Sequence, residues 1–219
     1  MRPLTMSSIA TPHPRTQQVG PLRWARLPYR TGEAAEPLAR AWLAREWHTS
    51  QAALSLLRNR HGRPYLSQAR HPGWDIGWSH SGDGLLVTLA HGVRVGVDLE
   101  RQRERPRAAE LARRFFAQDE AQWLNALPPE RHQAMFVRVW CAKEAVLKAH
   151  GRGIAFGLAR LRFDWDPAAD RLLLRDCDPV LGLPAHWHLH EMQPQAGECA
   201  VLAWHAHAPD ADRLDNPAP

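Results

Sequence analysis

The sequence has no long hydrophobic run and no paired cysteine motif, and its first residues do not predict a secretory signal. No stretch of about 18 apolar residues occurs, so a transmembrane helix is not predicted. Residues 1–20 are polar and contain proline, which is not the composition of a secretory signal. The cysteines Cys141, Cys177 and Cys199 form no CxxC pair, which argues against a disulfide scaffold. We therefore expect a cytoplasmic protein that does not enter a membrane.

The chain is basic and long enough to bury a substantial core. With 219 residues and 44% hydrophobic content, it can form one domain or two small lobes. A net charge of +5 favours an anionic partner, and nucleic acid is one candidate. Residues 101–114 are rich in arginine but also contain Glu104 and Glu110. A solvated amphipathic helix explains this stretch better than a nucleic-acid-binding helix, because basic faces alone carry no groove-reading element.

A strand pattern surrounds the segment Gly96-Val97-Asp98-Leu99-Glu100. Apolar residues alternate with Asp98 and Glu100, which predicts that both carboxylates project from one face of the strand. Residues two apart on a strand are separated by roughly 6.6 Å, so one hard cation can lie between the two side chains. The ordinary alternative is a solvated outer face. Residues 85–92 predict the preceding arm of a hairpin with a tight turn.

Residues 129–149 have helical periodicity, with an apolar stripe that includes Phe136 and Leu147. Lys143 falls inside this stripe, whereas Glu144 and Lys148 form an i,i+4 pair on the neighbouring flank. A partly buried carboxylate beside an ammonium group can bind a metal ion or accept a proton. The alternatives are a common helix-surface pair for Glu144 and Lys148, and a snorkelling side chain for Lys143.

Histidines alternate in the segment that contains His186, His188 and His190, which predicts a strand with these side chains on one face. Zinc sites usually combine histidine with cysteine or carboxylate ligands from another element. A polar strand face is therefore the favoured interpretation, with zinc binding as the alternative.

The order of predicted strands and helices indicates an α+β fold with two lobes. We expect a flexible tail over residues 1–20, an N-terminal lobe over residues 21–91, a C-terminal lobe with the metal site over residues 92–207, and a second flexible tail over residues 208–219.

Five short segments share their residues, order and spacing with a known enzyme family. They are Asn59-Arg60-His61-Gly62-Arg63-Pro64-Tyr65, Trp78-Ser79-His80-Ser81, Gly96-Val97-Asp98-Leu99-Glu100, Ala112-Arg113-Arg114-Phe115-Phe116 and Trp140-Cys141-Ala142-Lys143-Glu144-Ala145-Val146-Leu147-Lys148. Together they resemble the signature of 4′-phosphopantetheinyl transferases of the surfactin-synthetase-activating type. The resemblance is clear over residues 38–163.

The resemblance implies a reaction, a set of ligands and a fold. Such enzymes transfer the phosphopantetheine arm of coenzyme A to a serine hydroxyl of an apo acyl or peptidyl carrier protein, and they release adenosine 3′,5′-bisphosphate. They use Mg²⁺ or Mn²⁺ and serve fatty-acid, polyketide or nonribosomal-peptide synthesis. The implied fold has two pseudo-symmetric lobes, each a small antiparallel sheet packed with helices, with the active site in the cleft between them. We expect a monomeric holo-[acyl-carrier-protein] synthase type transferase whose basic charge suits coenzyme A and acidic carrier proteins.

The resemblance also assigns roles residue by residue. The metal-binding carboxylates are Asp98, Glu100 and Glu144. Glu144 also matches the general base for the serine, and Lys148 stabilises the transferred phosphate. The residues that match coenzyme A contacts are Arg63, Ser79, His80, Lys143, Lys148, Arg30 and Thr31.

Two other functions use the same residues. A non-catalytic basic module for nucleic acid or an acidic protein would use the arginine-rich stretch. A metal-dependent phosphoesterase would use the same carboxylates but would need no carrier protein.

Overall fold

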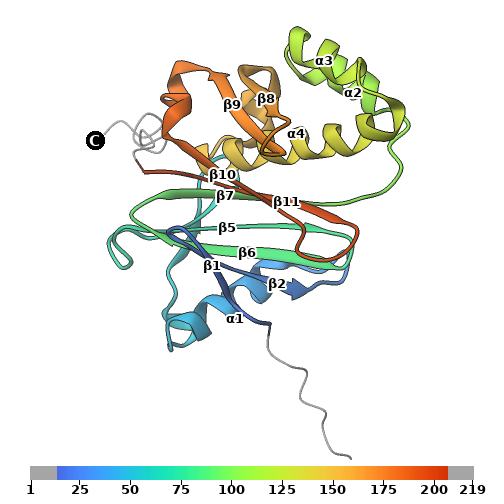
Figure 1. Cartoon of the computed structure of the whole chain (residues 1–219). Coiled ribbons are helices and arrows are strands. Elements are labelled where there is room, and N and C mark those ends of the chain that lie inside the picture. The colour runs from blue at the N-terminus through green and yellow to red at the C-terminus, as the bar shows by residue number, and fades with distance from the viewer. Residues whose placement is uncertain (1–13, 207–219) are drawn as a thin grey trace, which may run out of the picture.

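The computed structural model describes residues 14–206 as two antiparallel sheets that pack face to face, with a helix against the outer face of each (Figure 1). The predicted C-terminal tail lies outside the described residues, as do residues 1–13 of the predicted N-terminal tail. Within residues 14–206, no helix is long and apolar enough to cross a membrane. The small antiparallel sheets and packed helices confirm the predicted α+β class.

The first sheet has the strand order β1-β2-β6-β5 and is covered by α1. Its elements are β1 (Gln17–Val19), β2 (Leu22–Pro28), α1 (Ala35–Glu46), β5 (Trp74–Ser81) and β6 (Gly84–His91). A short hairpin of β3 (Leu56–Arg58) and β4 (Pro64–Leu66) follows a 3-10 turn at Gln51–Ala53. Strand β1 lies within the stretch that the sequence predicted as an N-terminal tail, and it pairs with β2.

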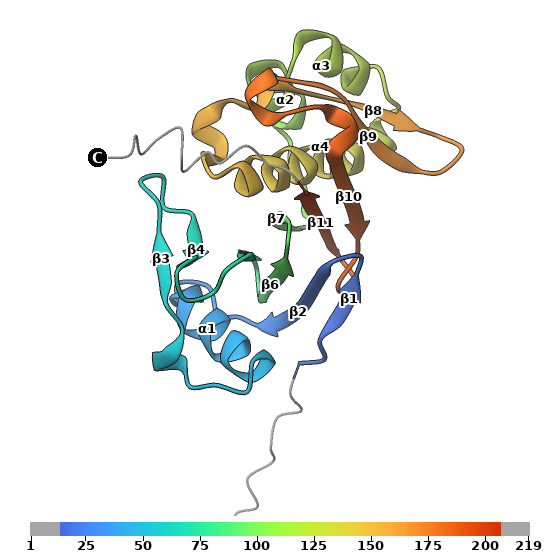
Figure 2. The ribbon, with the colours of Figure 1, turned by 90° about the vertical axis from the view of Figure 1, so that its left-hand side faces the viewer.

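The second sheet has the order β10-β11-β7, and the long helix α4 lies on it (Figure 2). Its elements are β7 (Arg94–Arg101), α4 (Pro129–His150), β10 (Trp187–Met192) and β11 (Glu198–His205). Around α4 lie α2 (Ala108–Phe115), α3 (Gln118–Asn125) and the hairpin of β8 (Leu161–Asp166) and β9 (Arg171–Cys177). Short 3-10 turns occupy Gly153–Phe156, Leu158–Arg160, Pro179–Leu181 and Pro184–His186. Helix α4 begins at a proline and ends before Gly151, whose φ of 101° suits a left-handed cap.

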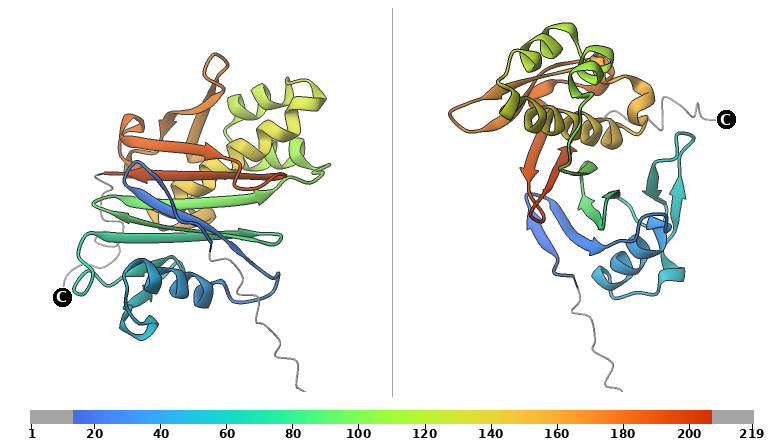
Figure 3. Two further views of the ribbon diagram at one scale, coloured as in Figure 1. Left: turned by 60° about the horizontal axis from the view of Figure 1, so that its bottom comes forward. Right: turned by 90° about the vertical axis from the view of Figure 1, so that its right-hand side faces the viewer.

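The predicted hairpin between residues 85–92 and β7 is wrong. Strands β6 and β7 are consecutive in the chain but belong to different sheets (Figure 3). Both edges of β6 are occupied, one by β2 and the other by β5, so no edge remains for β7. Strand β7 instead pairs with β11 along its whole length.

The period-2 pattern of β7 sorts its side chains onto two faces, as the sequence predicted. Val95, Val97 and Leu99 are buried against apolar side chains of the first sheet. Gly96, Asp98 and Glu100 therefore face the other side, where α4 lies. Gly96 has no side chain at the point where α4 crosses the strand, which allows the two backbones to approach closely.

Side chains join β5 to β7, the terminal strands of the two sheets. The backbone N–H of Val95 donates to Oδ2 of Asp75 at 2.8 Å. Further along, the hydroxyl groups of Ser79 and Ser81 bond to carboxylates of β7. This polar seam brings residues of the first sheet alongside the carboxylates of the second.

Candidate active site

Asp98 lies at the centre of a buried polar cluster formed by three elements. The Ser79 hydroxyl of β5 donates to Oδ1 of Asp98 at 3.0 Å. Nζ of Lys148 from α4 lies 2.6 Å from the same oxygen and 3.0 Å from Oγ of Ser79. The Asp98 side chain is only 6% exposed, whereas that of Lys148 is 32% exposed, so Lys148 is the more solvent-accessible member of this ion pair.

Glu100 is held in a similar way, two residues further along β7. Nη2 of Arg105 lies 2.5 Å from Oε2 of Glu100, and the Ser81 hydroxyl lies 3.4 Å from the same oxygen. Burial raises the pKa of Glu100, as does the charge of Asp98, while Arg105 opposes both.

Glu144 supplies the third carboxylate of the cluster from α4. The residue is 6% exposed, and burial together with the negative charges of Asp98 and Glu100 raises its pKa to about 7. Burial lowers the pKa of Lys148, but Asp98 and Glu144 outweigh it and raise the pKa overall. At neutral pH the ammonium group stays charged, while the Glu144 carboxyl group can take up or release a proton.

The cluster has donor atoms of the kind that a hard divalent cation prefers. Oδ2 of Asp98 is buried and has no hydrogen-bond partner among residues 14–206. No group of three or more His, Cys, Asp and Glu side chains in that range is arranged to hold a metal ion by itself. Mg²⁺ commonly takes only one or two carboxylates and completes its shell with water and substrate phosphate. The oxygen donors therefore fit Mg²⁺ bound together with a phosphate ligand.

Lys143 does not join this cluster, which corrects its predicted contact with a coenzyme A phosphate. Its side chain is fully buried, and Nζ lies 2.6 Å from Oε2 of Glu120 on α3. The ammonium group also donates to the backbone oxygens of Leu158 and Leu161. Burial lowers the pKa of Lys143 to about 8 and raises that of Glu120, so desolvation outweighs their mutual attraction. All its partners are internal, because it projects from the apolar stripe of α4.

Arg63 also contacts groups within the protein, which corrects the prediction that it contacts a coenzyme A phosphate. Its side chain is 8% exposed, and Nη2 lies 2.5 Å from Oδ2 of Asp75. Nε donates to the backbone oxygen of Lys148 at 2.8 Å, and Nη2 donates to that of Val95 at 3.0 Å. The guanidinium group therefore ties the β3–β4 hairpin to α4 and β7.

The predicted coenzyme A residues Arg30, Thr31 and His80 lie around the C-terminal end of β5. His80 is exposed and stacks on Tyr29, with ring centroids 4.4 Å apart. The Thr31 hydroxyl donates to the backbone oxygen of Gly82 at 3.0 Å. Arg30 is highly exposed and lies 3.5 Å from Glu33. These residues surround the β5–β6 turn, next to the strand position that places Ser79 on Asp98.

Comparison with known proteins identifies the half of the chain that carries the three carboxylates. Residues 94–202 match the family model of the 4′-phosphopantetheinyl transferase superfamily. This half of the chain belongs to that superfamily. The matched residues include Asp98, Glu100, Glu144 and Lys148.

Individual members of the superfamily share substantial identity with the chain. A protein of Synechocystis sp. that is provisionally named a 4′-phosphopantetheinyl transferase is 35% identical over 152 residues, which cover 68% of this chain and 59% of the relative. The 4′-phosphopantetheinyl transferase psf-1 of Bacillus pumilus is 39% identical over 98 residues, covering 45% and 40%. The 4′-phosphopantetheinyl transferase AcpT of Salmonella typhi is 36% identical over 123 residues, covering 54% and 63%. The chain spans about half the length of the curated relatives it matches.

The sequence did not predict that Arg105 and Ser81 lie beside the carboxylates of the half that matches the superfamily. Arg105 was grouped with a solvated arginine-rich stretch, yet its side chain is only 15% exposed. Ser81 was noted only as part of the Ser-His-Ser motif. The signal that was available is alternation, because Ser79 and Ser81 have the same spacing on β5 as Asp98 and Glu100 on β7.

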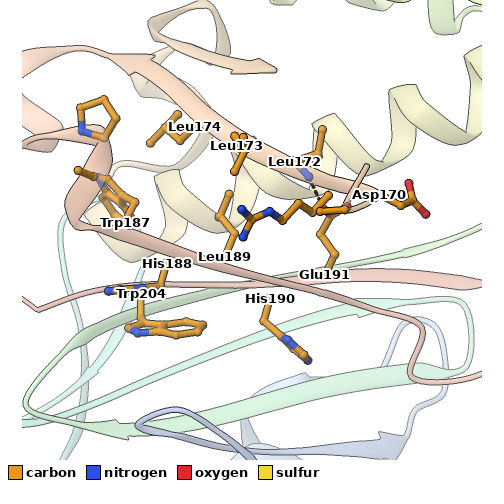
Figure 4. Close-up of a pocket in the computed structure, with 14 residues that line it drawn as sticks. Asp170, Leu172, Leu173, Leu174, Trp187, His188, Leu189, His190, Glu191 and Trp204 are labelled. Atoms are coloured by element: carbon orange, nitrogen blue, oxygen red, sulfur yellow. Dashed lines mark hydrogen bonds between the residues drawn. The ribbon is translucent and has the colours of Figure 1, made fainter. Parts of the chain in front are cut away.

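A cavity of about 580 Å³ between β9 and β10 contains none of the predicted transferase residues (Figure 4). His188 and His190 of β10 line it, and His188 stacks on Trp204 with ring centroids 5.2 Å apart. These histidines are not part of any group of three or more His, Cys, Asp and Glu side chains within residues 14–206 that could hold a metal ion. The predicted strand is present over Trp187–Met192, while His186 precedes it in a 3-10 turn.

Proposed function

We propose that the chain transfers the 4′-phosphopantetheine arm of coenzyme A to a serine hydroxyl of an apo acyl or peptidyl carrier protein, releasing adenosine 3′,5′-bisphosphate. It would act as a holo-[acyl-carrier-protein] synthase of the surfactin-synthetase-activating type. The observation that carries the proposal is the convergence of Asp98, Glu144 and Lys148 on one cluster, within residues that match the superfamily.

Each residue of the cluster has a chemical task in this reaction. Glu144, whose pKa near 7 suits a general base, accepts the proton of the carrier serine, directly or through water. The serine oxygen forms a bond to phosphorus while the pyrophosphate P–O bond breaks, and the nucleotide leaves with its electron pair. Lys148 stabilises the negative charge on the transferred phosphate. We assign Asp98, Glu100 and Glu144 as the carboxylates that would hold Mg²⁺ or Mn²⁺, directly or through water, and the bound ion would neutralise pyrophosphate charge.

The coenzyme A contacts that remain in the proposal are Ser79, His80, Arg30 and Thr31, together with Lys148. Arg63 and Lys143 are no longer among them, because their cationic groups are buried against internal partners. We place coenzyme A in the cleft between two lobes, residues 21–91 and 92–207. The net charge of +5 supports an acidic carrier protein as the partner. We further propose that the protein works as a monomer in the cytoplasm.

Mass spectrometry tests this function directly. The full chain is incubated with coenzyme A, Mg²⁺ and an apo carrier protein, and the carrier should gain about 340 Da, the mass of the transferred arm. Glu144→Gln and Asp98→Asn should abolish the gain while near-ultraviolet circular dichroism shows a native fold. An unmodified carrier with the wild-type protein would contradict the proposal. Cleavage of coenzyme A without any carrier would favour a phosphoesterase, and binding of DNA without transfer would favour a non-catalytic module.

A further inference from the structure

The two carboxylates of β7 are anchored by the same kind of partners. Each receives one serine of β5 and one cation on a single oxygen, Oδ1 of Asp98 and Oε2 of Glu100. Ser79 and Lys148 hold the first, and Ser81 and Arg105 hold the second. Oδ2 of Asp98 is buried and has no hydrogen-bond partner among residues 14–206, and neither contact on Glu100 uses its Oε1. These contacts therefore orient each side chain through one oxygen and do not use the second.

The position of Arg105 is fixed by contacts outside the carboxylate cluster. Arg105 belongs to the loop between β7 and α2, and its backbone N–H donates to Oε1 of Gln133 on α4 at 2.9 Å. Nε2 of Gln133 donates back to the backbone oxygen of Arg103 at 3.0 Å. The same helix carries Glu144. The loop is thus attached to the element that supplies the third carboxylate, and the guanidinium group reaches Glu100 from a defined backbone position.

We propose that Arg105 is a positioning residue for the divalent cation: it holds Oε2 of Glu100 so that Oε1 is presented to the ion. This role rests on the proposed function, because the ion belongs to that proposal. Residues that hydrogen-bond to a metal-ligating side chain keep its donor atom in place, and their loss typically lowers metal affinity by roughly 10- to 100-fold.

The opposite role for Arg105 predicts an opposite result. A guanidinium group that competed with the metal for Glu100 would weaken metal binding, and its removal would then increase the affinity. The position of Ser81 on the same oxygen favours positioning, since both donors are on Oε2 and neither contacts Oε1. The sign of the change in metal affinity therefore separates the two roles.

The test is a titration of the full chain with Mn²⁺ alone, with free Mn²⁺ followed by electron paramagnetic resonance. Arg105→Met should weaken Mn²⁺ binding by about 10- to 100-fold. Arg105→Lys keeps the charge but not the planar guanidinium group, so its affinity for Mn²⁺ should lie between those of the wild type and Arg105→Met. Arg107→Met is the matched control, because Arg107 is in the same loop but pairs with the exposed Glu110, and its affinity should equal that of the wild type.

Transfer assays add a second readout. In Arg105→Lys, which retains an ion pair and is the variant least prone to misfolding, the Mg²⁺ concentration for half-maximal transfer should rise by about 3- to 10-fold, while kcat at saturating Mg²⁺ stays within about twofold of wild type. Unchanged or tighter Mn²⁺ binding in both Arg105 variants would overturn the proposal, as would a wild-type chain that binds no Mn²⁺. A wild-type chain that binds Mn²⁺ but modifies no carrier protein would instead defeat the proposed function and leave the role of Arg105 intact.

Discussion

The backbone of Gly96 lies so close to that of Ala145 that a Cβ atom on the glycine would overlap the Ala145 carbonyl oxygen. This contact sets the distance between β7 and α4. Asp98 follows Gly96 on the same face of the strand, and Glu144 precedes Ala145 on the helix. The close approach therefore brings the carboxylates of two elements into one cluster.

Replacing Gly96 should destabilise the protein and disrupt the cluster. In Gly96→Ala the new methyl group meets backbone atoms that cannot rotate away, so the unfolding free energy should fall by about 3 kcal/mol, the upper part of the usual range for overpacking. Gly77→Ala is the matched control in β5, since a Cβ there makes ordinary contacts at 3.5 Å. It should change the unfolding free energy by less than about 1 kcal/mol. Urea unfolding measures both, and equal effects would contradict the role of the close contact.

The sequence predicted the strand and the helix of the site because both have clear periodicity. Alternation placed Asp98 and Glu100 on one face, and the apolar stripe of residues 129–149 put Lys143 toward the core. The apolar stripe agrees with the buried position of Lys143, whereas the family resemblance gave it a phosphate contact that the structure does not support. Its partner Glu120 lies on another helix, and periodicity within one helix does not indicate which residue of another helix it meets.

The sequence also does not predict that β5 and β7 are neighbours. The two strands exchange no backbone ladder and belong to different sheets, so nothing in their own patterns indicates that they are neighbours. The same holds for Arg63, whose acceptors come from Asp75, Val95 and Lys148. The loop sequence shows only an arginine near glycine and proline. It is the same whether the arginine binds a ligand or contacts the rest of the protein.

The buried pair of Lys143 and Glu120 should behave as a structural unit. Lys143→Met leaves a buried carboxylate without its counter-ion, so the unfolding free energy should fall by about 3–5 kcal/mol. Glu120→Gln should also lower the unfolding free energy, because it leaves the buried ammonium group without its counter-ion. The double variant should lose less than the sum of the two single variants. Additive losses in urea unfolding would contradict the pairing. The coenzyme A affinity of the folded Lys143→Met protein should equal that of the wild type.

Arg63 should affect stability and not coenzyme A binding. Arg63→Met removes the cation from the buried Asp75 and breaks the links to α4 and β7, which should lower the unfolding free energy by about 3 kcal/mol or more. Arg70→Met, at an exposed position of the same half, should be neutral within about 0.5 kcal/mol. A stable Arg63→Met protein with a raised KM for coenzyme A would restore the phosphate role that the structure argues against.

His80 tests the coenzyme A side of the proposal. His80→Ala removes an exposed ring that stacks on Tyr29, and we expect the KM for coenzyme A to rise about tenfold, which corresponds to roughly 1.4 kcal/mol. The kcat should stay within about twofold, because His80 does not contact the carboxylates. His91→Ala, at the opposite end of the same strand pair, serves as the control and should leave both constants unchanged. An unchanged KM in His80→Ala would remove His80 from the binding site.

Variants of Lys148 should distinguish stabilisation of transition-state charge from binding of coenzyme A. Its ammonium group lies on Asp98 and Ser79, and its side chain is 32% exposed, so we expect it to contact the transferred phosphate while it stays in the cluster. Lys148→Met should lower kcat by about 10²- to 10³-fold, the usual cost of losing one group that stabilises transition-state charge. Lys148→Arg retains the charge but is bulkier and planar, and it should recover only part of this loss. Steady-state kinetics at saturating coenzyme A measure both variants. If the Met variant changed only KM, Lys148 would hold coenzyme A equally in the ground and transition states, and its catalytic role would be wrong.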